Sequence, residues 1–273
     1  MSLLKCPVCS LPLEKAERCY LCLSRHSFDI ARHGYVNLLM SNKASSKRHG
    51  DDRLMVLSRQ AFLEKGYYSC LRDRLSELAV RLCGSEITML DAGCGEGWYT
   101  LGVKSALEST GKSCLAIGID ISKDALIQAA RRSKELTLAV AGVNALPVSD
   151  GECDLLLNVF APNDDAEFAR AVKGGGVLLK AVPLQRHLME LKAAIYDRPY
   201  ENPPAAYAPE GFELLAFEEV RTAIHLPCQE DIWNLFTMTP YYYKTGRADQ
   251  EKLRALNELD VSLEFGVFAL RRK

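Results

Sequence analysis

The sequence predicts an α/β protein whose main domain is a doubly wound, mostly parallel sheet, preceded by a small N-terminal metal-binding module. Two observations support this prediction. From residue 67 onward, apolar strand candidates alternate with amphipathic helix candidates, a pattern typical of a parallel sheet covered by helices. The first 26 residues hold four cysteines and a histidine, and three of these cysteines and the histidine have a spacing typical of zinc sites.

Length and composition agree with this architecture. The chain has 273 residues, enough for one α/β domain of about 200 residues and a small module. Its 48% hydrophobic and 25% charged residues are ordinary for a globular protein. No apolar run reaches the roughly 20 residues that span a bilayer, so we expect no membrane partner. The N-terminus lacks the long apolar core of a signal peptide, and ten cysteines then suggest thiols and metal ligands in a reducing cytoplasm.

Charge is distributed unevenly along the chain. The formal net charge is −1, yet residues 1–59 hold ten Lys and Arg against five Asp and Glu, a local net charge of +5. The rest of the chain is therefore acidic. A basic segment on an acidic body suits binding to a phosphate backbone. The alternative is an ordinary solvated basic face.

The N-terminal module is predicted to hold one structural Zn²⁺. Cys6 and Cys9 form a C-x2-C pair, and Cys22 and His26 follow in the pattern C-x2-C-x12-C-x3-H. Four such donors fill a tetrahedral zinc and leave no position for water, so the ion organises the fold and does not catalyse. An all-thiolate set in which Cys19 replaces His26 remains the alternative.

Composition also suggests boundaries. Residues 1–40 form the zinc module, with His33–Leu39 as its last strand or turn, and residues 41–66 form a basic linker and a connecting helix. Asp51 or Asp52 is suited to cap that helix, which should end at Gly66. Residues 67–273 form the main domain, and residues 67–83 are its first amphipathic helix.

A glycine-rich loop gives the main functional signal. A strand over Ile87–Leu90 leads into Asp91, then Gly93, Gly95 and Gly97, and a helix over Trp98–Leu107. Such glycines allow a sharp strand-to-helix turn and let backbone amides approach a ligand. The spacing G-x-G-x-G differs from the dinucleotide G-x-G-x-x-G, and the charge of Glu96 would repel phosphates. The negative charge of Glu96 instead favours a ligand with positive groups, such as S-adenosyl-L-methionine.

A second acid completes this signal. Asp120 ends an apolar strand, Leu115–Asp120, and lies 23 residues beyond Gly97. A carboxylate at that offset can accept both hydroxyls of a ribose. Gly142 stands where an acid that reads adenine is common, so Asn144 or backbone groups should hold the adenine. This part of the chain resembles the class I (Rossmann-like) methyltransferases, and S-adenosylmethionine is the expected cofactor.

The remaining elements follow in order. Ser122 should cap a helix that runs to Arg132, and Asn163–Asp165 should cap the helix after the fourth strand. Because ligands bind at the carboxyl ends of parallel strands, residues that end the strands are site candidates, Asn158 among them. The expected strands are residues 136–141, 154–160, 176–182, 212–224 and 262–271, the last two as a hairpin, with helices over 231–238 and 249–256.

Over nearly its whole length the chain resembles the RlmA family of 23S ribosomal RNA (guanine-N1)-methyltransferases. The resemblance rests on the zinc ligand pattern and on the segments Gly34–Leu39, Ala61–Tyr68, Leu90–Gly97, Arg186–Lys192 and Met238–Pro240. It implies methylation of guanine N1 in a 23S rRNA hairpin, with guanine 745 as the expected position and the zinc module helping to recognise the RNA. It also implies cofactor contacts by Tyr68, Gly95, Glu96 and His187.

The chemistry of guanine suggests roles for two residues. N1 carries a proton at neutral pH, so the reaction needs in-line alignment, a proton acceptor near N1 and a donor toward O6. We expect Asn158 to be that donor, and His187 to contact cofactor, base or phosphate. The target base should be splayed out and stacked on an aromatic ring. Candidate rings are those of Trp98, Phe160 and Tyr241–Tyr243.

Other functions remain open from sequence alone. Related enzymes methylate neighbouring rRNA guanines, and a small-metabolite methyltransferase would share the cofactor motifs. A non-catalytic RNA-binding protein with this fold is a third possibility, although the intact glycine loop and Asp120 argue against it. The sequence also leaves a homodimer open.

Overall fold

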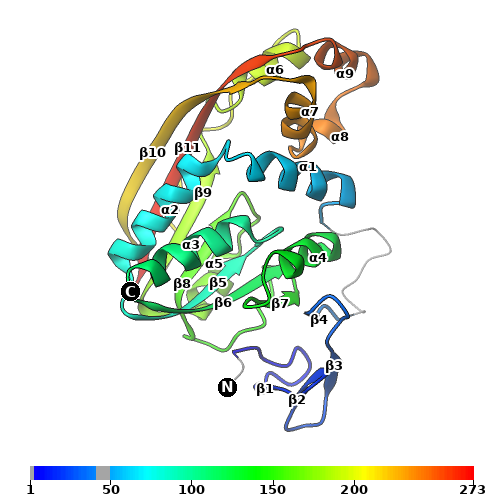
Figure 1. The fold of residues 1–273 in the computed structure, drawn as a ribbon. Coiled ribbons are helices and arrows are strands. Elements are labelled where there is room, and N and C mark those ends of the chain that lie inside the picture. Colours follow the sequence, from blue (N-terminus) through cyan, green and yellow to red (C-terminus); the bar gives the residue numbers. More distant parts are fainter. Residues whose placement is uncertain (1–2, 41–49) are drawn as a thin grey trace.

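The computed structural model describes residues 3–40 and 50–273, which form two sheets (Figure 1). The larger sheet has eight strands in the order β10-β11-β9-β8-β5-β6-β7-β4, and the smaller one has the order β1-β2-β3. Neighbouring strands from β4 to β9 run parallel, whereas β11 is antiparallel to both β9 and β10. The predicted doubly wound, mostly parallel sheet with a C-terminal hairpin is confirmed.

The strands of the large sheet are buried apolar runs. They span Tyr35–Asn37 (β4), Glu86–Ala92 (β5), Ser113–Asp120 (β6), Thr137–Val140 (β7), Cys153–Val159 (β8), Val172–Pro183 (β9), Phe212–Leu226 (β10) and Leu259–Arg272 (β11). Successive side chains point to opposite faces, so each central strand serves two hydrophobic clusters. Leu155 and Leu157 belong to one cluster, and Leu156 belongs to the other.

Helices cover both faces. Residues from α2 (Ser69–Leu82), α3 (Trp98–Ser109) and α4 (Lys123–Arg132) pack in the first cluster, whereas α5 (Asp165–Ala171) packs in the second. The predicted caps are confirmed: Asp52, Ser122 and Asp164 accept backbone N–H bonds at the starts of α1 (Arg53–Glu64), α4 and α5. Each cap satisfies an amide that the first turn of a helix would otherwise leave unpaired.

Four short helices form a cap at one end of the sheet, beside the long strands β10 and β11 (Figure 1). They are α6 (Met189–Ile195), α7 (Gln229–Thr237), α8 (Tyr241–Lys244) and α9 (Arg247–Arg254). Helix α1 packs against α7, and the turn that follows α1 is tied to buried Asp231 of α7, which accepts hydrogen bonds from Lys65 (2.5 Å) and from the Tyr67 hydroxyl (2.7 Å). The connecting helix is therefore fixed against this cap.

The zinc module lies at the opposite end and contains the strands β1 (Leu13–Lys15), β2 (Cys19–Cys22) and β3 (Ser27–Asp29) (Figure 1). It is joined to the main domain, because Leu4 bridges to Val148 and the Lys5 amide donates to the Pro147 carbonyl. Leu4 and Leu13 are buried in the same cluster as residues of β5 and β6. Zinc is thus not this module's only source of order.

Residues 33–39, expected as the last strand or turn of the zinc module, contain β4. This strand bridges back to the module between Ile30 and Val36, and it also pairs in parallel with β7 at the edge of the large sheet. Three residues carry too little pattern to reveal a partner so far along the chain. The predicted polar loop at residues 41–49 lies outside the described residues. The division into residues 1–40, 41–66 and 67–273 stays a prediction.

No helix in the described part of the chain is both long and apolar enough to cross a bilayer. All ten cysteines are free thiols, four of them gathered in the zinc module.

Candidate functional site: a cofactor cleft and a zinc centre

The glycine-rich loop joins β5 to α3 at the carboxyl edge of the sheet. Gly93, Gly95 and Gly97 all have positive φ, at 95°, 55° and 80°, a backbone conformation that favours glycine. Gly93 also approaches another loop closely, since a Cβ there would lie 2.4 Å from that of Ala161. A Cβ on Gly95 would meet only the Arg59 guanidinium, at 4.0 Å. The loop thus leaves an open side along which a ligand can lie against backbone amides.

Asp91 lies directly beneath this loop and is 1% exposed. Its Oδ2 accepts a 2.6 Å hydrogen bond from the Thr100 hydroxyl, while its Oδ1 has no hydrogen-bond partner among the described residues. Burial raises the pKa of Asp91 to about 7. A buried carboxylate with a free oxygen fits a cofactor that carries an ammonium or sulfonium group.

Asp120 ends β6 beside the loop. Its Oδ2 accepts the Gly95 amide (2.9 Å) and its Oδ1 accepts the Ser122 amide (2.8 Å). These bonds fix the carboxylate and leave further lone pairs on both oxygens, since an ionised carboxylate offers about four acceptor sites. The geometry therefore suits the bidentate contact with ribose hydroxyls expected from the sequence.

Glu96 differs from its expected environment. The side chain is 2% exposed and forms an ion pair with Arg132 of α4, whose Nε also donates to the Glu96 carbonyl (3.2 Å). Burial raises the pKa of Glu96, and the Arg132 charge opposes that shift. We expected the Glu96 charge to face a positively charged ligand. In the structure, the Arg132 guanidinium already neutralises that charge.

A group of aromatic rings lies next to the loop. Tyr68 packs edge-on against Phe265 with ring centroids 4.9 Å apart, and His187 lies 4.7 Å from the same ring. Phe160, at the end of β8, lies 5.6 Å from Phe265 and is 43% exposed. Its φ of 53° is rare for a bulky residue, and such strained conformations gather at functional sites.

His187 is held in one protonation state. Its Nδ1 accepts the Glu264 backbone amide (3.2 Å), so the neutral ring carries its proton on Nε2, which lies 3.4 Å from the Tyr68 hydroxyl oxygen. Burial lowers the pKa of His187 to about 3, with the Lys192 charge acting in the same direction. The ring thus has no free lone pair for a proton, which leaves it the roles of donor and contact residue.

Asn158 also differs from its expected role. Its amide nitrogen donates to the carbonyls of Ala92 (3.0 Å) and Pro162 (2.9 Å), and its oxygen accepts from Lys180 (2.6 Å). Both amide protons are therefore used within the protein, and neither is free to reach a guanine O6. Burial lowers the pKa of that lysine to about 8. Asn158 joins the ends of β5 and β8 to the loop that carries Phe160.

The other candidate residues are distributed unevenly. Asn144 is exposed after β7, at the carboxyl edge where adenine was expected. Trp98 is only 7% exposed beneath the Arg72 guanidinium, and Tyr242 packs against Trp233 and Phe236, so these rings are not open to stacking. Tyr243 is 59% exposed and donates to Asp52. Phe160 is the candidate ring that lines the cleft and stays accessible.

The four predicted zinc ligands come together. The donor atoms of Cys6, Cys9, Cys22 and His26 all lie within 4.8 Å of one another. The contact between the Cys9 and Cys22 sulfurs is 3.6 Å, and His26 Nδ1 lies 3.5 Å from Cys6 and 3.4 Å from Cys22. Zn–S bonds of about 2.3 Å and Zn–N bonds of about 2.0–2.1 Å give tetrahedral edges of about 3.5–3.8 Å. The donor set therefore fits one structural zinc.

Local backbone geometry explains this set. Ser10 and Arg25 have positive φ (61° and 65°), and their amides bond back to the carbonyls of Cys6 and Cys22 in two tight turns. A hydrogen bond from the Leu11 amide lowers the pKa of Cys9 to about 6, which favours the thiolate that binds metal. Cys19 lies outside the group, because residues three apart on a strand point to opposite faces.

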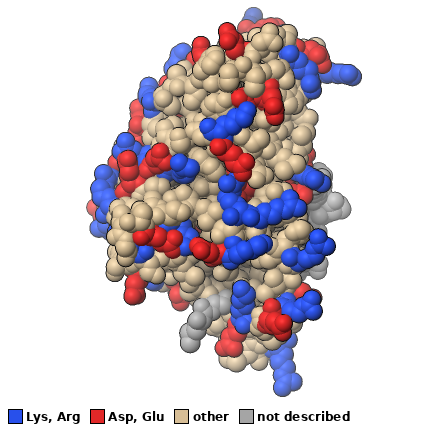
Figure 2. Space-filling view, in the orientation of Figure 1, with Lys and Arg blue, Asp and Glu red and all other residues tan. Residues whose placement is uncertain are grey.

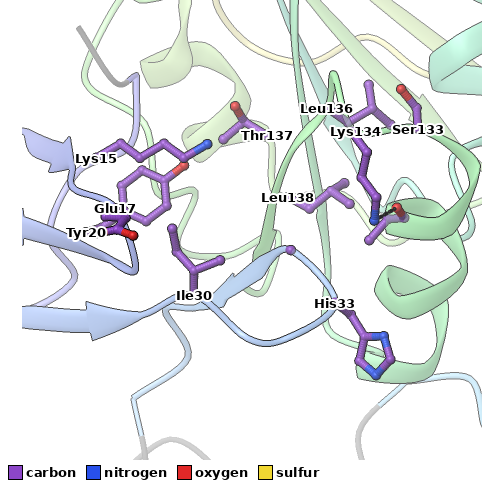
Figure 3. A pocket seen from close by; sticks show the side chains of 12 residues that line it. Lys15, Glu17, Tyr20, Ile30, His33, Ser133, Lys134, Leu136, Thr137 and Leu138 are labelled. Atoms are coloured by element: carbon purple, nitrogen blue, oxygen red, sulfur yellow. Dashed lines mark hydrogen bonds between the residues drawn. The ribbon is translucent and has the colours of Figure 1, made fainter.

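Sequence reasoning missed several residues of the site. The residues around the glycine loop include Tyr99, Thr100, Arg59 and Arg132. For Tyr99 and Thr100, the position just after the third glycine is a signal in the sequence. Arg59 and Arg132 have no such signal. A separate cavity of about 220 Å³ lies between the zinc module and α4, lined by Lys15, His33 and Lys134 among others (Figure 3). It opens at the amino ends of β4 and β7, the edge opposite the cofactor cleft.

Comparison with known proteins agrees with this geometry. A family model described as "RlmA, N-terminal" matches residues 4–47, and one described as "Methyltransferase domain" matches residues 89–176. YxjB of Bacillus subtilis, grouped by its name with the 23S rRNA (guanine-N(1)-)-methyltransferases, is 32% identical over 97% of this chain and 96% of its own length. The chain belongs to this methyltransferase family. The zinc centre and the glycine loop are therefore parts of one S-adenosylmethionine-dependent enzyme.

Two further similarities add detail. The 23S rRNA (guanine(748)-N(1))-methyltransferase of Streptomyces fradiae is 36% identical over 82% of this chain and 80% of its own. A solved structure described as a type II methyltransferase of Anaeromyxobacter dehalogenans has a TM-score of 0.51, covers 72% of this chain and 95% of its own, and is 19% identical. The latter shows the methyltransferase fold alone.

Proposed function

We propose that this enzyme transfers a methyl group from S-adenosylmethionine to N1 of a guanine in a hairpin of 23S rRNA. The observation that carries the proposal is the accessible Phe160 ring beside the glycine loop, bordered by Tyr68 and Phe265. A purine that leaves the RNA stack needs such an aromatic surface. The names of the relatives from B. subtilis and S. fradiae support the same substrate.

The cofactor supplies an electrophilic methyl group on a sulfonium centre when it is bound. The protein's part is to position and to orient. In our proposal Asp120 holds the ribose, Gly93, Gly95 and Gly97 offer backbone amides, Asn144 reads the adenine edge, and Asp91 balances positive charge. Tyr68 and His187 contact the cofactor at the methyl-transfer side. Glu96 acts through its ion pair with Arg132, which shapes the loop.

As the methyl group bonds to N1 and its bond to sulfur breaks, the N1 proton passes to solvent water, and negative charge grows on O6 while that proton leaves. Because His187 Nε2–H points at the Tyr68 oxygen, the Tyr68 hydroxyl proton is free to turn toward the cleft. We assign to Tyr68 the donor role first expected of Asn158. Asn158 and Lys180 then act as positioning residues for the Phe160 loop. Alignment of the reacting atoms supplies much of the rate gain.

The RNA-binding surface in this proposal is the zinc module with the adjoining face of α4. Figure 2 shows Lys and Arg side chains gathered at the level of α4 and on the module below it, with acidic side chains between them. The described part of the module carries Arg25 and Arg32, and α4 carries Arg131. Lys43, Lys47 and Arg48, expected from the sequence to contribute, lie outside the described residues.

The test is methylation of a hairpin transcript by the purified full-length enzyme, followed by primer extension, since N1-methylguanine blocks copying. We expect one stop at guanine 745, and none on a transcript with adenine at that position. A stop at guanine 748, the position in the S. fradiae enzyme's name, would move the target to the neighbouring guanine. Cofactor binding without any RNA methylation would overturn the proposal in favour of a metabolite methyltransferase or a non-catalytic protein.

We further propose that the enzyme works in the cytoplasm, where its ten free thiols stay reduced. A homodimer is also part of the proposal. It is supported by Leu214 (50% exposed) and Phe217 (39% exposed) on the edge strand β10. Sedimentation velocity at two protein concentrations decides between monomer and dimer.

A further inference from the structure

The hydroxyl of Tyr99 is buried without a hydrogen-bond partner among the described residues. Tyr99 is the second residue of α3, directly after the glycine loop, and is 9% exposed. Burial raises the pKa of this hydroxyl well above its usual range, so it stays a neutral donor. Buried hydroxyls are nearly always paired, so this hydroxyl beside the glycine loop calls for a partner that a ligand or an ordered water would supply.

The Arg59 guanidinium lies near enough to this hydroxyl for its charge to act on it. Arg59 projects from α1 toward the loop, where its Nη1 lies 4.0 Å from the place of a Cβ on Gly95. Its charge acts on the hydroxyls of both Tyr68 and Tyr99, opposing the rise that burial causes in the pKa of each.

The Arg59 side chain is held in position by two groups. Nη1 forms an ion pair with Asp51, and Nη2 donates to the Met238 carbonyl (3.2 Å). Asp51 itself is tied to the turn between β6 and α4, because its carbonyl accepts from the Ser122 hydroxyl (2.6 Å). Arginine has five N–H donors in a planar fork, so these contacts leave donors for another anion.

S-adenosylmethionine has a single anionic group at neutral pH, the carboxylate of its methionine end. With the ribose at Asp120, that end would lie along the open side of Gly95, whose amide donates to Asp120. We propose that Arg59 and Tyr99 form the subsite for this carboxylate, Arg59 through its guanidinium and Tyr99 through its hydroxyl. The assignment rests on the proposed use of S-adenosylmethionine and names the residues that select its amino-acid end.

The subsite is tested by isothermal titration with two cofactors, S-adenosylmethionine and its decarboxylated form, which lacks only the carboxylate. Tyr99→Phe removes one oxygen and Arg59→Gln removes the charge. We expect affinity for S-adenosylmethionine to fall about 5–10-fold in the first variant and about 10–100-fold in the second, as for charge-assisted hydrogen bonds. Affinity for the decarboxylated form should stay within about threefold or rise in Arg59→Gln. Arg53→Gln, on the same helix and exposed, is the matched control.

Equal losses for both cofactors, or no loss for S-adenosylmethionine, would overturn the carboxylate subsite while leaving the enzyme's activity in place. Failure of the wild-type protein to bind either cofactor would instead overturn the cofactor itself and, with it, the proposed function. Tyr99→Phe keeps the ring that packs against Trp98 and Phe160, so a loss of folding in Arg59→Gln does not remove the test.

Discussion

At the scale of single residues, two acids at strand ends differ in their surroundings. Asp91 and Asp120 lie at the ends of neighbouring parallel strands. Among the described residues, Asp91 Oδ1 has no hydrogen-bond partner, whereas the Asp120 carboxylate accepts two backbone amides. In the proposed site, Asp91 balances positive charge on the cofactor and Asp120 accepts the ribose hydroxyls.

Asp120→Ala should weaken cofactor binding by one to two orders of magnitude without unfolding the protein. Hydrogen bonds to a charged group contribute about 1.5–3 kcal/mol each, and two ribose hydroxyls would lose their acceptor. Calorimetric titration with S-adenosylmethionine measures the loss, and circular dichroism checks the fold. Wild-type affinity in this variant would show that the ribose lies elsewhere.

Asp91 should link cofactor binding to pH. Its folded-state pKa is raised from 3.8 to about 7, so the free protein holds a proton that the unfolded chain would release between these values. The stabilisation from this group is present below pH 3.8 and is lost as pH rises through 7. A positive ligand favours the carboxylate, so cofactor affinity should rise from pH 6 to pH 8 with release of up to one proton.

Titration in two buffers of different ionisation enthalpy counts the protons released on binding. Asp91→Asn, which keeps the shape of the side chain, should bind with no proton release and little pH dependence over this range. Proton release of the same size in that variant would assign the titration to another group.

At the scale of elements, the connecting helix α1 lies outside the main sheet but contributes a side chain to the site. It brings Arg59 to the glycine loop and is fixed to α7 by Lys65, Tyr67 and Asp231. Asp231→Ala should lower the free energy of unfolding by about 2–4 kcal/mol, because a buried acid with two partners is removed. Chemical denaturation measures this change.

The matched control is Asp197→Ala. Asp197 also pairs with a lysine, but its side chain is 93% exposed. Exposed pairs contribute about 0–1 kcal/mol, so this variant should unfold close to wild type. If both substitutions lower the free energy of unfolding equally, the buried contact of Asp231 contributes no more to stability than an exposed ion pair.

The zinc module should matter to RNA and little to the cofactor. Cys9→Ser removes one of four zinc ligands, so the tight turns that carry Arg25 and His26 lose their order. RNA affinity should fall and its salt dependence should become shallower, as fewer counterions are released. Cofactor affinity should stay within about threefold. Titrations with the hairpin at two salt concentrations and with S-adenosylmethionine check both; unchanged hairpin affinity in zinc-free protein would contradict an RNA-binding role.

Sequence periodicity predicted most elements because each carries its own signal. The glycine loop, the caps and the alternating apolar runs are local, and the structure confirms them. The errors arose where a partner far along the chain decides the outcome. Asn158 was predicted to have a free amide. Its hydrogen bonds with Ala92 and Lys180 depend on which strands are neighbours in the sheet, and this is not visible in the local sequence. Glu96 was read as a free charge because Arg132 lies on another helix.

At the scale of the whole molecule, module and main domain share one hydrophobic cluster. Leu4 and Val36 are each 1% exposed in contact with residues of the large sheet. Deletion of residues 1–40 should therefore destabilise the methyltransferase domain itself, since it removes strand β4 and uncovers apolar side chains. We expect a thermal midpoint well below that of Cys9→Ser. A deletion variant that unfolds at the wild-type temperature would show that the main domain is independent.

The pairing of β4 with β7 also has a consequence for how the protein is made. Tyr35 pairs with Leu138, so the N-terminal strand leaves the ribosome long before its neighbour has been synthesised. During that interval the zinc ligands Cys6 to His26 are already present and can close around the metal by local turns, whereas Val36 and Leu4 have no surface to cover. Early zinc capture would keep this segment compact until β7 appears. During synthesis, zinc would thus stabilise the N-terminal segment before the residues that later pack against it have been made.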